Sequence, residues 1–217
     1  AVAATATGRT GFVATQVPPG GRSLLAGATG DGRVILVPVK YDVTFEGDRR
    51  VTKPNVGAAV TLEIDPRHRP ASCFAARLDD NGNATAAAQL ADGTLTVVHQ
   101  GTEQNLLTGE STASIATHQT RPSSPVTTLV MDAEQKNLYG GTQDGKLLWW
   151  PLADGVPGQV SETSTGGSPV TALTLLIGGR SLVVGQADGV ISVWFPVRQA
   201  DNTFRMIRIR DFPPLPG

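Results

Sequence analysis

The stretch Leu182–Phe195 carries the clearest hydrophobic pattern in the chain: an apolar run, an Asp-Gly pair, and a second apolar run that ends in an aromatic residue. Two apolar runs separated by Asp-Gly predict a β-hairpin with a two-residue type I′ turn, because both residues tolerate positive φ. The same pattern recurs at Leu138–Trp150 and, in weaker form, at Leu24–Pro38 and Ala86–Val98. Four copies of one hairpin indicate an internal repeat.

The spacing of the Asp-Gly pairs suggests the size of the repeat. Successive pairs, which begin at Asp31, Asp92, Asp144 and Asp188, lie 61, 52 and 44 residues apart. Periods of this length are typical of propeller blades with four strands each. The sequence therefore predicts one all-β domain over residues 1–217, a β-propeller or half-propeller of four WD-like blades that forms part of a larger propeller. The expected blades cover residues 11–65, 72–118, 125–163 and 169–212.

The strand after each Asp-Gly pair is apolar at most positions of both faces. Such a strand must be covered on both sides, as it is when sheets stack face to face around an axis. A β-sandwich or a β-solenoid remains an alternative. We expect Trp149 and Val193 to be buried between blades, and positive φ at the glycines of the pairs, Gly32, Gly93, Gly145 and Gly189.

The first blade has two candidates for its outer strand, residues 41–45 and residues 60–64. The segment between them, residues 46–55, is polar and rich in turn formers, so we expect an exposed excursion there.

Composition narrows the classes of partner. The formal net charge is -1, which gives no general attraction to nucleic acid or to an anionic membrane. No apolar run approaches the roughly 20 residues of a membrane-spanning helix. The single cysteine, Cys73, excludes an internal disulfide and lies in an apolar strand pattern, which favours a buried structural thiol.

The sequence contains no recognisable catalytic, cofactor or metal motif. The three histidines, His68, His99 and His118, are far apart in sequence and lack neighbouring Cys ligands, which indicates surface or blade-edge positions. The Asp residues of the Asp-Gly pairs are expected to form turns rather than a metal site. We therefore predict no catalytic residue, no cofactor and no metal.

The only basic cluster is formed by Arg205, Arg208 and Arg210, with Arg198 upstream. Side chains alternate along a strand, so Arg208 and Arg210 are expected to share one face. The three arginines are the candidate site for contact with a partner or an anion. The alternative is a charged edge strand that discourages aggregation.

The hairpin spacing and the aromatic residue that closes the third strand resemble those of WD-repeat propellers. In that family the strand often ends in Trp-Asp, where this chain has Val37-Pro38, Val98-His99, Trp150-Pro151 and Phe195-Pro196. The Gly-His pair that usually precedes the first strand is missing. The His–Asp–Trp hydrogen-bond network of that family is therefore not expected here.

A second resemblance concerns Leu182–Arg198 and Phe204–Pro214. These residues look like the propeller-like soluble insertion of some proteobacterial phosphate ABC transporter permease subunits. The resemblance implies a non-enzymatic interaction or regulatory domain in the periplasm, attached to an inner-membrane protein through helices outside this chain. Its implied partners are other transporter subunits.

Two other functions stay open: a free-standing cytoplasmic WD-type scaffold, and an enzyme with a site in the central channel. Four blades form only half of an eight-bladed ring, so the first and last blades would each expose an apolar face, such as that of Val190, Ser192 and Trp194. We therefore expect a homodimer through blades one and four. A closed four-bladed monomer is the alternative.

Overall fold

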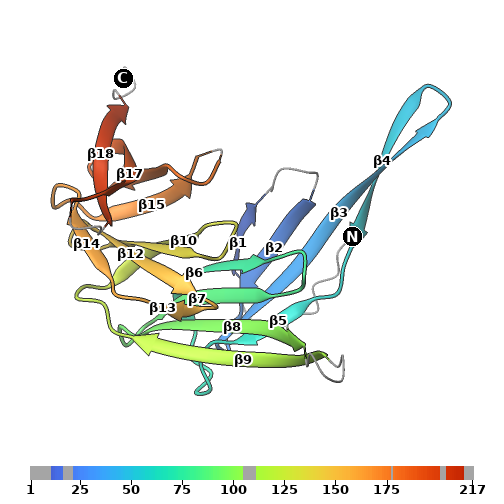
Figure 1. The fold of residues 1–217 in the computed structure, drawn as a ribbon, viewed down its shortest axis with the longest axis horizontal. Coiled ribbons are helices and arrows are strands. Elements are labelled where there is room, and N and C mark those ends of the chain that lie inside the picture. Colours follow the sequence, from blue (N-terminus) through green and yellow to red (C-terminus); the bar gives the residue numbers. More distant parts are fainter. Residues whose placement is uncertain (1–10, 17–21, 105–110, 177, 201–203, 213–217) are drawn as a thin grey trace.

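The computed structural model describes residues 11–16, 22–104, 111–176, 178–200 and 204–212, and in these residues every regular element is a β-strand. The strands form four antiparallel sheets that follow one another along the chain (Figure 1). The first contains β1 (Gly11–Gln16), β2 (Arg22–Ala28), β3 (Arg33–Glu46), β4 (Arg49–Val56) and β5 (Val60–Glu63), and the second β6 (Ala71–Leu78), β7 (Ala84–Leu90), β8 (Leu95–Gln104) and β9 (Ser111–Thr120). The third contains β10 (Val126–Met131), β11 (Asn137–Thr142), β12 (Lys146–Ala153), β13 (Val156–Pro157) and β14 (Ser161–Ser164), and the fourth β15 (Val170–Leu175), β16 (Leu182–Gln186), β17 (Ile191–Arg198) and β18 (Phe204–Phe212).

Three hydrophobic clusters hold the four sheets together, one at each junction between neighbours. Leu36 and Leu62 of the first sheet pack with Ala86 of the second, in the first cluster. The second cluster joins the second and third sheets, and the third joins the third and fourth. The second and third sheets are thus covered on both faces. The first and fourth sheets each have one face that no described sheet covers.

Small side chains let the second sheet pack closely between its neighbours. All seven residues of β7 are buried, and four of them are alanines. Because side chains alternate across a strand, Ala86 and Ala88 face the first sheet while Ala87 faces the third. Burial of both faces matches the two-sided apolar pattern of the sequence.

The Asp-Gly turns differ in type from the prediction, although the predicted positive φ of their glycines is confirmed. Gly32, Gly93, Gly145 and Gly189 have φ between 74° and 86°, but none of the aspartates before them has a positive φ. The N–H of Gly93 donates to the Leu90 carbonyl, and that of Leu90 to the Thr94 carbonyl. This pattern is a three-residue loop with a type I turn and a bulged glycine, rather than a two-residue type I′ turn.

A β-bulge recurs in the first strands of the second, third and fourth sheets. The strand register skips one residue in each, Ser72, Thr127 and Thr171. Their hydroxyls donate to carbonyl oxygens of the adjacent strand, at Gln89 (3.0 Å), Gly141 (3.0 Å) and Gly185 (3.3 Å). The repeated Ser-Pro-Val-Thr sequence ends at two of these residues. Its threonine therefore stabilises a local break in strand pairing.

The two candidates for the outer strand of the first sheet have different roles. Residues 60–63 form β5, which pairs with β3 in the sheet. Residues 41–46 continue β3 beyond the sheet and pair with β4, which includes most of the predicted polar excursion. We call this two-stranded ribbon, residues 41–56, the arm. Figure 1 shows the arm projecting away from the rest of the molecule.

The predicted full burial of Trp149 is wrong. Trp149 is half-buried, stacks on Tyr139 at 6.2 Å between ring centroids, and donates its indole N–H to Asn137 Oδ1 at 2.9 Å. The neighbouring Trp150, 2% exposed, fills the core between the second and third sheets. The burial of Val193 is confirmed, but this residue lies on the uncovered face of the fourth sheet.

The Asp-Gly turns provide a test of packing at the sheet ends. All four glycines share positive φ, but a Cβ on Gly145 would lie 2.6 Å from the Ser168 carbonyl oxygen, whereas one on Gly189 would meet nothing within 4 Å. Backbone strain of about 1–2 kcal/mol is common to both alanine variants. We therefore expect Gly145→Ala to destabilise the protein by at least about 1 kcal/mol more than Gly189→Ala, measured by urea unfolding. Equal losses would show that the loop beside Gly145 is not packed as described.

Candidate interaction surfaces

The predicted arginine cluster lies on β18 but does not share one face. A bulge in the pairing of β17 and β18 places Arg208 opposite Trp194 and Arg210 opposite Val193. Adjacent residues of β17 point to opposite faces, so the expectation that Arg208 and Arg210 lie together is wrong. Their contacts agree with the register: Arg208 Nε donates to Asp211 Oδ1 at 2.6 Å, and Arg210 lies 5.0 Å over the Phe212 ring.

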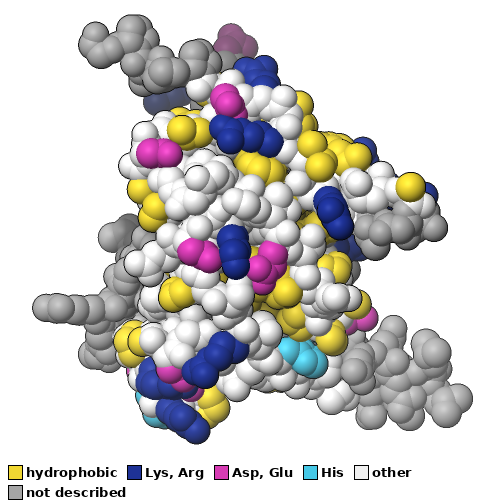
Figure 2. Space-filling model, turned by 90° about the vertical axis from the view of Figure 1, so that its left-hand side faces the viewer, with side chains coloured by type: hydrophobic (Ala, Val, Ile, Leu, Met, Phe, Trp, Pro, Cys, Tyr) yellow, Lys and Arg dark blue, Asp and Glu magenta, His cyan; other side chains and the backbone are white. Residues whose placement is uncertain are grey.

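The arginines therefore form no single anion-binding set. Arg205 pairs in register with Val197 and lies on the same outer face as Arg210. Figure 2 views the molecule from the left-hand side of Figure 1 and shows basic side chains at several separate places among acidic and hydrophobic ones, with a group at the lower left that also contains acidic atoms. This distribution suits a mixed protein surface better than a site for a polyanion.

The outer face of the fourth sheet is rich in apolar side chains. It includes Ile191 (44% exposed), Ile207 (43%) and Phe212 (38%), with Phe195 half-buried among them. The sequence pattern predicts that the opposite face of this sheet, that of Val190, Ser192 and Trp194, is the exposed one. Ser192 and Trp194, 0% and 4% exposed, point into the core shared with the third sheet, so that part of the prediction is wrong.

The outer face of the first sheet continues without interruption into the arm. Alternate residues of β3 share one face, and on this face Ile35 and Val37 are half-buried while Val39 is 6% exposed. Beyond the sheet the same face carries Tyr41, Val43 and Phe45. Both ends of the row of sheets thus present apolar surface.

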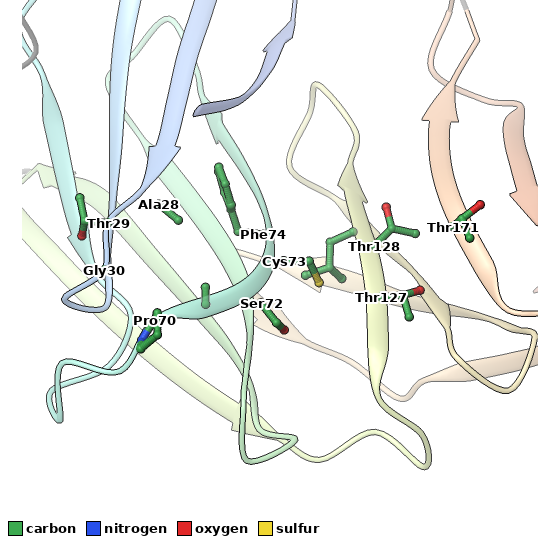
Figure 3. A pocket seen from close by; sticks show the side chains of 12 residues that line it. Ala28, Thr29, Gly30, Pro70, Ser72, Cys73, Phe74, Thr127, Thr128 and Thr171 are labelled. Atoms are coloured by element: carbon green, nitrogen blue, oxygen red, sulfur yellow. The ribbon is translucent and has the colours of Figure 1, made fainter. Parts of the chain in front are cut away.

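A groove of about 350 Å³ lies where the first strands of the second, third and fourth sheets approach the β2–β3 hairpin (Figure 3). Its lining contains the bulge residues Ser72, Thr127 and Thr171, whose hydroxyl protons are engaged by backbone carbonyls. Burial raises the pKa of the Cys73 thiol to about 12, so this residue is protonated at neutral pH. These four lining residues are therefore not prepared for acid–base or nucleophilic chemistry.

A polar network spans the second and third sheets at their β6–β7 and β10–β11 ends. The hydroxyl of Thr85 donates to Gln135 Oε1 at 2.5 Å and so accepts a hydrogen bond from His99 Nδ1 at 2.8 Å. Gln135 Nε2 donates in turn to the Asn83 carbonyl at 3.1 Å. Thr85 is completely buried. His99 therefore serves a structural network, while His68 is exposed and His118 lies on the outer strand β9.

A buried guanidinium also links these two sheets. Arg77 is 8% exposed and donates to the carbonyls of Ala76 and Met131, while its Nε has no partner among the described residues. Burial lowers the pKa of Arg77 to about 10. Backbone carbonyls, rather than a carboxylate, accept the hydrogen bonds of this cation. Through the Met131 carbonyl, Arg77 joins β6 to β10.

Arg69 joins the first and second sheets through two carboxylates. Its Nε donates to Asp65 Oδ2 at 2.6 Å, and its Nη1 to Asp92 Oδ2 at 2.5 Å. Asp65, 2% exposed, also accepts the backbone N–H of Arg69 at 3.1 Å. The pKa values of Asp65 and Asp92 are both lowered, mainly because Arg69 donates a hydrogen bond to each carboxylate.

Neither the arm nor the Arg69 bridge was recognised from the sequence. The arm had a signal: Tyr41, Val43 and Phe45 alternate with polar residues, and Glu46-Gly47-Asp48 can close a hairpin. Asp65 and Arg69 are close in sequence but lie in a segment without periodicity, and their link to Asp92 depends on the stacking of two sheets.

Within the part of the chain that the structure describes, no three His, Cys, Asp or Glu side chains gather as a metal site would require. None of the described residues forms a helix with the length and hydrophobicity of a membrane span.

Comparison with known proteins supports the fold and no specific function. No family model matches the sequence, and no curated protein matches it. Solved structures that match include Raptor from Chaetomium thermophilum, with a TM-score of 0.50 and 15% identity, over 94% of this chain. This chain spans 16% of that protein. At this identity the likeness concerns the all-β arrangement alone.

The Arg69 bridge predicts a specific loss of stability in acid. The pKa values of Asp65 and Asp92 are lowered in the folded state, so the stabilisation that these carboxylates contribute is complete above their ordinary pKa of 3.8 and is lost as the pH falls through the folded-state pKa values. We expect the free energy of unfolding to fall between about pH 5 and pH 2, and Arg69→Gln to reduce this pH dependence while lowering stability at pH 7.

Urea unfolding at a series of pH values measures this effect, with Arg67→Gln as the matched control. The side chain of Arg67 is exposed, so its loss should leave the profile unchanged. Part of the acid sensitivity should survive in both variants, because Arg33 and Thr29 lower the pKa of Asp31 to about 2. An Arg69→Gln profile parallel to that of the wild type would contradict the bridge.

Proposed function

We propose that this chain is a non-enzymatic protein-interaction module built as an open segment of a β-propeller. The observation that carries the proposal is the apolar surface on the outer faces of the first and fourth sheets, together with two inner sheets that are covered on both faces. A row of sheets with uncovered ends has surface to bury against a partner. Face-to-face stacking of four antiparallel sheets in chain order supports the propeller arrangement.

The groove beside the first strands supports a binding role more than a catalytic one. In a propeller, the first strand of each blade lines the central channel, which is where an enzyme of this fold would place its site. Here the bulge hydroxyls are engaged by carbonyls, and the raised pKa of Cys73 keeps its thiol protonated. A channel enzyme therefore remains the least supported of the three functions.

The partner that the two end faces fit best is a second copy of the chain. In a two-fold arrangement the first sheet of each copy meets the fourth sheet of the other, so that both uncovered faces are buried in one ring. This pairing is a homodimer of two four-sheet halves.

The setting of the module is a further proposal. The resemblance of β16–β18 to the soluble insertion of phosphate permease subunits favours a periplasmic domain that contacts other transporter subunits, and a cytoplasmic scaffold is the alternative. Recovery of the intact gene product wholly outside the membrane fraction would contradict the permease setting.

Sedimentation velocity over a micromolar concentration range tests the proposed pairing. We expect the wild-type chain to sediment as a dimer of two 22.6 kDa subunits. Ile207→Glu should give the monomer, because it places a charge on the outer face of the fourth sheet. Ile115→Glu is the matched control, since Ile115 is 68% exposed but lies on β9, away from both end faces.

A wild-type chain that stays monomeric throughout this range would overturn the dimer. Equal dissociation by the two glutamate variants would overturn the assignment of the interface to the end faces.

A further inference from the structure

The arm is a two-stranded ribbon with little support from the rest of the fold. Among the described residues, β3 pairs only with β4 from Tyr41 onward, because β2 ends its pairing with β3 at Lys40 and β5 pairs no further than Leu36. Isolated two-stranded ribbons are marginally stable in water and need a covered apolar face. The projection of the arm into solvent therefore requires an explanation.

The two faces of the arm differ in chemistry. One face is mainly apolar: it carries Tyr41 (45% exposed), Val43 (44%), Phe45 (70%) and Val56 (46%), with Thr52 and Arg50 as its polar members on β4. On the other face Asp42 is opposite Lys53 and Glu46 is opposite Arg49, and Val51 is opposite Thr44. Opposite charges at facing positions stabilise a ribbon in water. The polar face is thus suited to solvent, whereas the apolar face is left without a partner in one copy of the chain.

The apolar face of the arm extends the surface that was proposed above to pair. Ile35, Val37 and Val39 precede Tyr41 on the same face of β3, so the outer face of the first sheet and the arm form one stripe. At about 3.3 Å per residue, the stripe from Ile35 to Phe45 is about 33 Å long. Whatever covers the first sheet is therefore positioned to cover the arm as well.

We propose that the arm clasps a second copy of this chain by lying along the outer face of its fourth sheet; this inference rests on the proposed dimer. That face offers Ile191, Ile207 and Phe212 to the aromatic side chains of the arm. Charges also suit the contact at the tip of the arm: Asp48 lies there, while Arg205 on the fourth sheet has no acidic partner among the described residues.

The exposed area agrees with what a stable dimer needs. A large side chain offers about 150–250 Å² when fully exposed. With the exposed fractions given above, the arm and the outer face of the fourth sheet together leave on the order of 700 Å² of apolar surface per copy in water. Two copies would bury roughly twice this area, within the range of about 1,200–2,000 Å² typical of specific interfaces.

Sedimentation equilibrium of two arm variants tests the clasp. Phe45→Glu places a charge on the apolar face and should weaken dimerisation at least tenfold. Thr44→Glu is the matched control, because Thr44 is exposed on the opposite face of the same ribbon. It should change the dissociation constant less than twofold. Both positions are solvent-exposed in the single copy, so neither variant should impair folding.

Cross-linking then identifies what the arm contacts. A photoreactive residue, Phe45→p-benzoylphenylalanine, is placed in an isotopically light chain and mixed with heavy wild-type chain, so that mass spectrometry distinguishes contacts between copies. We expect light–heavy cross-links within residues 191–212. A stable dimer that is insensitive to Phe45→Glu, or that cross-links from arm to arm, would overturn the clasp and leave the dimer standing. A monomeric wild type would overturn both.

Discussion

The structure depends on the stacking of apolar sheet faces. The third strands β8 and β12 have buried side chains on both faces, so each of their sheets is stable only between two others. Every added sheet covers one apolar face and introduces another. The row of four described sheets consequently ends in two faces that no described sheet covers. Ile207 meets solvent on the outer face of the fourth sheet, and Phe45 does so on the arm that extends the first. The proposed interaction role follows from this geometry rather than from a polar site.

Turns, bulges and hydrogen bonds that recur from sheet to sheet hold the strands in position for this stacking. The bulged glycine closes each central hairpin, and the hydroxyl of the bulge residue secures the first strand against its neighbour. Polar links then join adjacent sheets: Arg69 between the first and second, and Thr85 with Gln135 between the second and third. At the junction of the third and fourth sheets, the Thr127 hydroxyl lies within hydrogen-bond distance of the Val170 carbonyl as well as of the Gly141 carbonyl, so the two acceptors share its proton. These links orient the sheets, while the apolar clusters provide most of the burial.

The sequence predicted the all-β class, the central hairpins and the positive φ of four glycines, because these depend on local patterns. The sequence-based predictions were wrong where a shift of one residue in strand pairing changes the turn type or the face on which a side chain lies. The Asp-Gly turns have three loop residues where two were predicted. A bulge near Ile209 places Arg208 and Arg210 on opposite faces of β18. Trp149 is only half-buried, contrary to the prediction, whereas Trp150 is buried, because alternation in a strand that is apolar on both faces does not say which face is better covered. The Arg69 bridge depends on contacts between sheets, which no local pattern encodes.

Hydrogen exchange at two protein concentrations tests the central claim most directly. If the end faces pair with a second copy, amides in residues 35–45 and 191–212 should exchange more slowly at a concentration well above the dissociation constant than well below it, while β7, β8, β11 and β12 should remain slow at both. Exchange that is independent of concentration throughout residues 35–45 and 191–212 would contradict the account.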